Sequence, residues 1–309
     1  MKLFTISGDL GSGKTTVAQA LAEKLGCTYI STGTLQRKLA SDMGIDTLEL
    51  NRRAEQEQWI DDFIDGQIRD LESSAGVAVI ESRMAFHFLK SAWHIFLYCS
   101  EEIAAHRILT SKRDTETYQS LTEAIDSVAK RRAIEIRRFL KLYQVDISDL
   151  TNYDFILDTS YSTLQATIDC VYSLISRSQK PSKLIAISPR NLIPTQNARH
   201  LREADCTEYA RFFMGIRSDV VSLDDPVEII YLDHRFYIAN GHHRVSGALL
   251  SGKTWVACKI IAVNDQPYLL GLSARAFVRD AATMSTVYDW EAIHRTKVPF
   301  PNTTGDAKS

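Results

Sequence analysis

The chain has 309 residues, of which 45% are hydrophobic and 24% are charged. This composition is typical of a globular protein and excludes a disordered or collagen-like chain, and the length favours two domains. The mean hydropathy is −0.15, and no apolar run reaches the roughly 18 residues of a membrane span. The N-terminus becomes polar too early for a signal peptide, and the five cysteines form no CxxC pair. We therefore expect a cytoplasmic protein without a membrane anchor.

The net charge of −2 is unevenly distributed along the chain. Residues 1–176 carry 19 Lys and Arg against 25 Asp and Glu, whereas residues 177–309 carry 17 against 13. A chain this close to neutrality is not an obvious nucleic-acid binder, because such affinity rests mainly on neutralised phosphates. The basic second half nevertheless keeps nucleic acid open as a partner.

The first half alternates short apolar runs with segments of helical periodicity, which predicts an α/β fold with a parallel sheet flanked by helices. The expected strands are 2–7, 28–31, 77–80, 94–98 and 155–157, and the expected helices are 15–25, 35–43, 59–71, 101–111, 121–143 and 163–175. Residues 177–183 are polar and contain a proline, so this segment is the predicted linker after a first domain of residues 1–176.

The second half predicts a smaller α+β domain over residues 184–280. Its expected strands are 184–187, 227–232, 236–239 and 255–263, its expected helices are 204–213 and 244–250, and residues 233–235 form a hairpin turn. Residues 281–309 are interpreted as a C-terminal tail, whose end from residue 296 is small, polar and loose.

Residues 8–15, Gly-Asp-Leu-Gly-Ser-Gly-Lys-Thr, match the P-loop pattern G-x-x-x-x-G-K-[ST] at every position, between an expected strand and an expected helix. The glycines let backbone amides converge on phosphate oxygens, and the helix N-terminus favours an anion. Lys14 is expected to reach the β- and γ-phosphates of a nucleotide, and the Thr15 hydroxyl to ligate Mg²⁺. The predicted cofactor-binding residues are Gly8, Gly11, Ser12, Gly13, Lys14, Thr15 and Thr16. Asp9 is an acid inside this anion-binding loop, and we expect its side chain to point to solvent.

Arginines supply the second signal, because planar guanidinium groups suit phosphates. Arg37 opens an expected helix, and Arg83 follows a buried strand and therefore lies at the carboxyl edge of the sheet, where ligands bind in such folds. Arg131 and Arg138 are seven residues apart and share one helix face, with Glu135 between them to orient them. This set predicts an enzyme that neutralises the charge of two phosphorylated substrates.

Residues 1–176 resemble cytidylate kinases, especially the compact type typical of archaea. The resemblance runs through the P-loop, residues 30–33 and residues 81–83, and is strongest from Arg131 to residue 160. It implies an adenylate-kinase-like fold, ATP with Mg²⁺ as phosphoryl donor, and a nucleoside monophosphate such as CMP or dCMP as acceptor. It also implies that Arg37, Glu81 and Arg83 bind the acceptor. Lys14 and an arginine-bearing lid with Arg131 and Arg138 would then act on the transferring group.

The chain departs from this family at Ser82, at residues 84–88 and at Phe139, all of which alter the acceptor side more than the ATP side. Two alternatives therefore stay open. One is a kinase for a hydroxyl acceptor, either a modified DNA base or free serine, with Glu81 as the base. The other is a regulatory protein in which nucleotide binding only switches the conformation.

The second domain carries Asn-Gly-His-His-Arg at residues 240–244, between an expected strand and helix, where an anion could bind. No third metal ligand at useful spacing is evident, so no metal site is expected. Residues 183–263 resemble the ParB/sulfiredoxin superfamily, although no helix-turn-helix follows and no cysteine occupies the turn. The resemblance implies a second site for CTP or ATP at Gly241, His242, His243 and Arg244, and this domain would sense or consume the nucleotide product.

Overall fold

The computed structural model describes residues 2–54, 56–73, 76–110, 118, 120–180, 183–216, 220–221, 225–269 and 271–299. The chain forms two compact units. Unit 1 comprises residues 1–99, 104–157 and 164–183, and unit 2 comprises residues 100–103, 158–163 and 184–309. The change of unit after residue 183 coincides with the end of the expected linker, of which residues 181–182 lie outside the described part.

The sheet of unit 1 has the strand order β2-β3-β1-β4-β5. β1 (Lys2–Gly8) pairs in parallel with β3 (Val77–Glu81) and with β4 (Trp93–Tyr98). β2 (Thr28–Ser31) pairs in parallel with β3, and β5 (Phe155–Asp158) follows β4. All six residues of β4 are buried, as expected of a strand covered on both faces. The expected parallel α/β sheet is confirmed, and the end of β1 and the end of β3 meet at its carboxyl edge.

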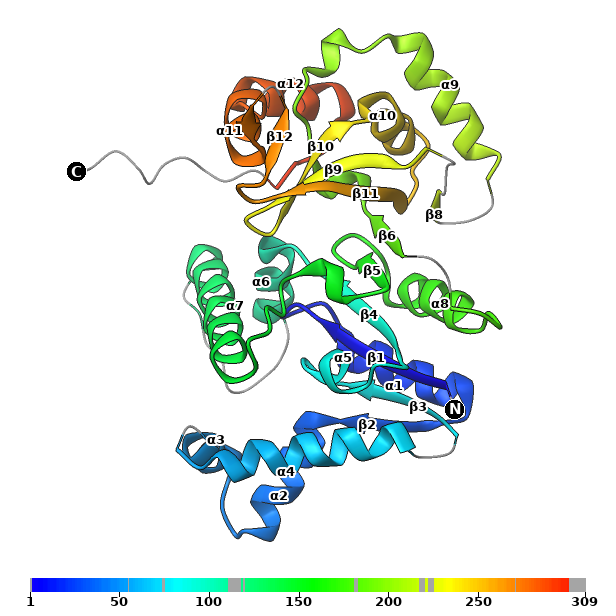
Figure 1. Ribbon diagram of the computed structural model, residues 1–309. Helices are drawn as coiled ribbons and strands as arrows, with labels where there is room; N and C mark the ends of the chain where they lie inside the picture. The colour runs from blue at the N-terminus through cyan, green and yellow to red at the C-terminus, as the bar shows by residue number, and fades with distance from the viewer. Residues whose placement is uncertain are drawn as a thin grey trace, which may run out of the picture. The chain divides into compact units, whose positions relative to one another are not determined.

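Helices connect these strands, and three of them form a separate layer beyond the edge strand β2 (Figure 1). These three helices share a small apolar core formed by Leu39, Ala40, Leu50, Ile60 and Ile64. They are α2 (Thr32–Asp42), α3 (Thr47–Ala54) and α4 (Gln58–Arg69). The other helical segments of unit 1 are α1 (Lys14–Leu25), η1 (Asp70–Ser73), α5 (Ala85–Phe88), α6 (Glu101–Thr110) from residue 104 on, α7 (Leu121–Tyr143), η2 (Leu150–Asn152) and α8 (Leu164–Ile175).

Unit 2 has a mixed sheet in the order β6-β11-β9-β10-β7, with β8 also paired to β11. Its strands are β6 (Leu184–Ile187), β7 (Leu192–Ile193), β8 (Val220–Val221), β9 (Val227–Leu232), β10 (Arg235–Asn240) and β11 (Trp255–Val263), and a separate hairpin joins β12 (Pro267–Leu269) to β13 (Leu272–Ser273). Its helical segments are η3 (Pro189–Asn191), η4 (Ala198–His200), α9 (Glu203–Met214), α10 (His242–Leu250), α11 (Ala274–Ala281) and α12 (Met284–His294). The tight β9–β10 hairpin agrees with the turn expected at residues 233–235.

The interpretation of residues 281–309 as a tail needs correction. Helix α12 (Met284–His294) lies within this segment, and its Val287 and Trp290 are buried. The apolar residues of this short helix show no clear helical periodicity, so its sequence signal is weak, and here tertiary packing stabilises it. Residues 300–309 lie outside the described part. Helices α3 and α5 were also not expected from the sequence.

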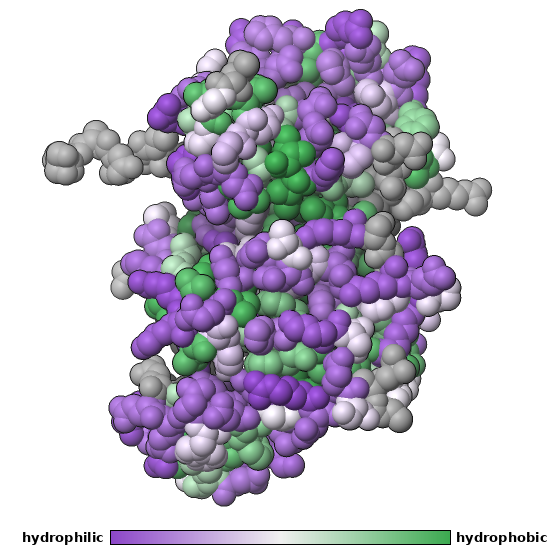
Figure 2. Space-filling model, in the orientation of Figure 1, coloured by the Kyte–Doolittle hydropathy of each residue, from purple (hydrophilic) through white to green (hydrophobic). Residues whose placement is uncertain are grey.

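Among the described residues, no helix is both long enough and apolar enough to cross a membrane. The face of the molecule in Figure 2 carries mainly hydrophilic residues, with smaller hydrophobic patches between them.

Within unit 2, α9 and α10 pack unusually closely at Gly247. A Cβ atom added at Gly247 would lie 2.5 Å from Cβ of Tyr209 and 3.0 Å from the backbone nitrogen of Ala210. Real Cβ atoms do not approach this closely, so the contact requires glycine at this position of α10.

We predict that Gly247→Ala forces α9 and α10 apart and lowers the free energy of unfolding by about 1–3 kcal/mol, the usual cost of overpacking. Gly66→Ala in α4 is the matched control, because no atom lies within 4 Å of the added Cβ. There we expect a gain of about 0.5–1 kcal/mol from helix propensity. Urea denaturation measures both changes, and equal effects of the two substitutions would contradict the close packing.

Candidate functional site

The P-loop connects β1 to α1 at the carboxyl edge of the unit 1 sheet. Gly8 ends β1 with a φ of 152°, and an added Cβ would lie 2.3 Å from the carbonyl oxygen of Leu97. Only glycine therefore allows the loop to leave the strand at this point. Gly13 precedes α1, which begins at Lys14 without a side-chain cap. The first amides of α1 are thus left without a side-chain acceptor, as the motif requires of a helix N-terminus that is to bind an anion.

Lys14 lies near one arginine and three carboxylates that affect its pKa. Burial, followed by the charge of Arg83, lowers the pKa of Lys14 to about 7, while Glu135, Glu81 and Asp9 act in the opposite direction. Its Nζ donates a hydrogen bond to the backbone carbonyl oxygen of Asp9 at 3.3 Å. The loop therefore holds a lysine whose charge the neighbouring carboxylates compensate only in part.

Glu81, the last residue of β3, binds both the P-loop and the neighbouring strand β2. The hydroxyl of Thr15 donates to Oε1 of Glu81 at 2.6 Å, and the phenol of Tyr29 on β2 donates to Oε2. Burial, together with the bond to Glu81, raises the pKa of Tyr29 to about 12, so the phenol remains a donor at neutral pH. Sequence reasoning missed Tyr29, although its strand is the neighbour of β3.

The oxygen atoms of Thr15 and Glu81 fit a nucleotide-bound Mg²⁺. Mg²⁺ in such sites uses one or two protein oxygens together with phosphate oxygens and water. Among the described residues, no group of three or more His, Cys, Asp or Glu could hold a metal ion by itself. The donor set of this loop thus suits a cation that arrives with its nucleotide.

Arg83 pairs with Glu135 of α7, with 3.0 Å between Nη2 and Oε2. We expected Glu135 to orient Arg131 and Arg138, and the structure instead joins it to the arginine at the sheet edge. Arg138 lies further along α7 and pairs with Asp61 of α4 at 3.3 Å. Arg131 is half-buried on the same helix. One face of α7 therefore meets both the sheet edge and the helical layer of α2 to α4.

The remaining predicted residues of unit 1 lie near the loop or on α2. The Ser12 hydroxyl donates to the Asp9 carbonyl at 2.8 Å, and Thr16 is exposed in the first turn of α1. Arg37 is exposed on α2 and donates to the hydroxyl of Thr34 at 3.0 Å. The structure thus brings Lys14, Thr15, Glu81 and Arg83 together, and it places Arg37 in the helical layer.

Two arginines that the sequence analysis did not select contact the P-loop. Nη1 of Arg107 on α6 donates to the carbonyl of Gly11 at 2.9 Å. Nε of Arg132 on α7 lies 3.9 Å from Oδ1 of Asp9. The expectation that Asp9 points to solvent is wrong, because its side chain is buried and accepts from the amide of Cys99 at 3.0 Å. The sequence could not single out Arg132, because spacing alone does not say which of two adjacent arginines contacts the P-loop.

Comparison with known proteins identifies this arrangement. Residues 3–161 match the model of the cytidylate kinase-like family. The chain belongs to this family. It is 38% identical to a cytidylate kinase from Pyrobaculum islandicum over 170 residues, which are 54% of this chain and 89% of the relative. It is 37% identical to a cytidylate kinase from Methanothrix thermoacetophila over 173 residues, which are 56% of this chain and 97% of the relative.

Among solved structures, the chain is similar to an uncharacterized protein from Eubacterium ventriosum, with a TM-score of 0.45 and 18% identity over 57% of this chain and 100% of that one. It is also similar to shikimate kinase from Bacteroides thetaiotaomicron, with a TM-score of 0.42 and 15% identity over 57% of this chain and 99% of that one.

The family assignment confirms the predicted class of enzyme. The relatives are named cytidylate kinase, so the chain is a phosphotransferase of the nucleoside monophosphate kinase type. These relatives give no support to the alternative that the chain is a regulatory protein without catalysis. The family match ends at residue 161, and the resemblance of the second domain to the ParB/sulfiredoxin superfamily stays a prediction.

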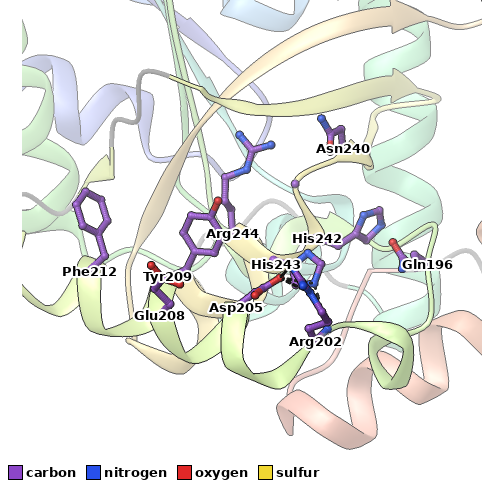
Figure 3. A pocket seen from close by; sticks show the side chains of 11 residues that line it. Gln196, Arg202, Asp205, Glu208, Tyr209, Phe212, Asn240, His242, His243 and Arg244 are labelled. Carbon is purple, nitrogen blue, oxygen red and sulfur yellow. Dashed lines mark hydrogen bonds and ion pairs between the residues drawn. The ribbon is translucent and has the colours of Figure 1, made fainter.

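In unit 2, residues 240–244 line a cavity of about 730 Å³ between α9 and the start of α10 (Figure 3). Nε2 of His243 accepts from the amide of Arg202 at 3.2 Å and lies 3.8 Å from Asp205. The remaining lining residues are Gln196, Glu208, Tyr209 and Phe212. The cavity therefore offers aromatic, acidic and basic groups to one ligand.

Two further predicted ligand groups, besides His243, are already bound by the protein. His242 is buried, and its Nε2 accepts from the amide of Thr195 at 3.1 Å. Burial, then the neighbouring His243, lowers the pKa of His242 to about 4, which keeps this ring neutral. Arg244 pairs with the carboxylate of Asp225 at 2.8 Å, and in Figure 3 its guanidinium points away from His243. We expected Arg244 and both histidines to surround one anion. The structure corrects this expectation, because Arg244 instead binds Asp225.

The low pKa of Lys14 predicts a pH-dependent affinity for ATP. The ammonium form attracts phosphate, and it is lost as the pH rises through about 7. Above that value, binding must recruit a proton, so we expect the dissociation constant to rise by up to about tenfold per pH unit between pH 7.5 and 9.

Isothermal calorimetry of ATP binding without acceptor measures this effect, and it should show proton uptake near pH 7. Lys14→Arg keeps its charge throughout this range, and its affinity should therefore be flat. Equal pH profiles of the two proteins would show that Lys14 is fully charged in the free enzyme.

Proposed function

We propose that unit 1 transfers the γ-phosphoryl group of ATP to a nucleoside monophosphate of the cytidylate type. The observation that carries this proposal is the convergence of Lys14, Thr15, Glu81 and Arg83 at one sheet edge in a member of the cytidylate kinase-like family. Such convergence suits a reaction between two charged phosphates, because transfer needs positioning and charge stabilisation.

On the donor side, the loop amides and Lys14 would hold the β- and γ-phosphates, and Thr15 would ligate Mg²⁺ together with Glu81. The cation supplies charge neutralisation between the two phosphates. An oxygen of the acceptor phosphate attacks the γ-phosphorus in line, and the bond to the bridging β-oxygen breaks. Lys14, together with Arg131 and Arg138 of α7, stabilises the charge on the transferring group.

On the acceptor side, Arg83 and Arg37 would bind the monophosphate. Arg83 is held by Glu135 at 3.0 Å, so its guanidinium is oriented before the acceptor arrives. A phosphate acceptor needs no general base. Both oxygens of Glu81 are engaged by Thr15 and Tyr29, and this observation favours the phosphate acceptor over a hydroxyl acceptor that would use Glu81 as its base.

We predict that CMP or dCMP is phosphorylated faster than AMP or GMP. Arg83→Ala should raise KM for the acceptor or lower kcat by at least about tenfold, the usual effect of losing a charged contact, while the affinity for ATP stays nearly unchanged. Lys14→Ala should lose turnover by at least about 100-fold.

A coupled assay of ADP formation over a panel of monophosphates measures these effects, and circular dichroism confirms the fold of each variant. Turnover of serine or of a hydroxymethylated base, with none of any monophosphate, would replace this acceptor by the hydroxyl alternative.

We further propose that unit 2 is a ParB/sulfiredoxin-like domain whose cavity binds a nucleoside triphosphate, CTP or ATP. The cavity volume of about 730 Å³ supports this proposal, because small-molecule sites commonly measure about 300–1,000 Å³. α10 begins at His242 behind Gly241 without a side-chain cap, so its first amides suit a phosphate. Tyr209 and Phe212 suit a base. Arg244 would then support the turn through Asp225 or exchange that carboxylate for phosphate.

We predict that the Lys14→Ala protein still binds one equivalent of CTP or ATP, and that Arg244→Ala in that background removes the binding. Because loss of the Asp225 pair could unfold the turn, His243→Ala serves as a second variant, for which we expect at least about a fivefold loss of affinity. Arg279→Ala, exposed on α11, is the matched control.

Calorimetry on the full chain measures the stoichiometry and affinity of this site. The proposal fails if the folded Lys14→Ala protein binds neither nucleotide.

All five cysteines are free thiols. Free thiols are usual in a reducing compartment, and this supports our placement of the protein in the cytoplasm.

A further inference from the structure

Asp9 is a buried carboxylate inside a loop that binds anions. Its side chain is only 8% exposed. Oδ2 accepts from the amide of Cys99 at 3.0 Å, and the Asp9 amide donates to the carbonyl of Leu97 at 2.9 Å. Both contacts are to the end of β4 and the residue after it, so the carboxylate is held rigidly at the base of the P-loop.

The other carboxylate oxygen of Asp9 faces an arginine of α7. Oδ1 lies 3.9 Å from Nε of Arg132, whose side chain is 22% exposed. The backbone carbonyl of the same Asp9 accepts from Nζ of Lys14 at 3.3 Å. One residue therefore contacts the P-loop lysine through its backbone and a helix arginine through its side chain.

The ion pair of Asp9 with Arg132 affects how the P-loop meets an anion. A carboxylate inside a phosphate site repels the ligand unless its charge is directed to a nearby cation. Nε–H is one of five donors of a guanidinium, and the four on the Nη atoms point in other directions. At 3.9 Å the pair is beyond hydrogen-bond distance, so the carboxylate attracts the Nε side of the guanidinium through its charge. Arg107 contacts the carbonyl of Gly11 at 2.9 Å, so a second arginine already flanks this loop.

We propose that Asp9 is a positioning residue that holds Arg132 beside the P-loop, so that Arg132 contacts the phosphates of the bound donor. This inference rests on the proposed function of unit 1, and it adds Arg132 to the groups that stabilise the transferring phosphoryl. In this role Asp9 acts through Arg132 and does not touch the substrate.

Two simpler roles of Asp9 give different results. If Asp9 only supports the Cys99 amide, Asp9→Asn keeps that acceptor and changes neither kcat nor KM. If Asp9 only raises the pKa of Lys14, Asp9→Asn shifts the pH profile, and it does so equally with and without Arg132.

The experiment is a double-mutant cycle of Asp9→Asn and Arg132→Gln in the full chain, with ATP and the best monophosphate acceptor. We expect Arg132→Gln to lower kcat by at least about 100-fold, as for other phosphoryl-contacting arginines. Asp9→Asn alone should lower kcat by about tenfold, because a displaced catalytic group still retains part of its effect. In the Arg132→Gln background, Asp9→Asn should change kcat by less than about twofold, since coupled residues are not additive.

The matched control is Arg137→Gln on the same helix, because Arg137 is exposed and its Nε donates to the carbonyl of Ala133. Its kcat should equal that of the wild-type protein. Additive effects of Asp9→Asn and Arg132→Gln, or an Arg132→Gln protein as active as Arg137→Gln, would overturn the proposal. If Asp9→Asn does not fold, Arg132→Lys replaces it: this variant keeps the charge without the planar fork and should lose at least about tenfold in kcat.

A binding measurement tests the role of Asp9 independently of which acceptor the enzyme phosphorylates. If the wild-type protein phosphorylates no acceptor, the proposed function fails. Calorimetry with AMP-PNP and Mg²⁺ then still decides the role of Asp9. Asp9→Asn and Arg132→Gln should each weaken binding by at least about fivefold relative to Arg137→Gln, and equal affinities of the three variants would overturn the inference.

Discussion

The compensation of the Lys14 charge is the constraint on which the unit 1 site depends. A buried ammonium beside Arg83 is unfavourable, and these two factors bring the pKa of Lys14 to about 7. Three carboxylates oppose this effect, and each comes from a different element: Asp9 from the loop after β1, Glu81 from the end of β3, and Glu135 from α7. The site thus holds its cations with its own anions, and the polyphosphate of the proposed donor would take over part of that role.

The same carboxylates also fix the surrounding side chains. Glu81 bonds Thr15 and Tyr29, Glu135 orients Arg83, and Asp9 faces Arg132. Charge compensation and preorganisation are therefore carried by the same bonds, and a carboxylate cannot be removed without affecting both. This coupling explains why an acid is tolerated at Asp9, where the motif alone suggests a conflict with the ligand.

The sequence predicted those elements whose structure depends on residues close together in the chain. The P-loop, its flanking strand and helix, and the long α7 follow from glycine placement and hydrophobic periodicity, and the structure shows them near the expected bounds. The partners of charged residues were not predictable in this way. Glu135 shares a helix face with Arg131 and Arg138, but its partner is Arg83, 52 residues earlier in the chain. The burial of Asp9 likewise depends on β4, and the packing of α12 on tertiary contacts.

The turn at residues 240–244 shows why residue types alone underdetermine a site. Two histidines and an arginine at a helix N-terminus supply many potential donors, yet the ring nitrogen of His242 acts as an acceptor for Thr195, and Arg244 is neutralised by Asp225. A ligand there must either use the groups that remain oriented to the cavity, such as His243 and the first amides of α10, or exchange Asp225 for its own anion. The side chain of Asp225 is 79% exposed. Water already solvates an exposed carboxylate and screens its ion pair, so exchange by a phosphate costs less here than it would for a fully buried pair.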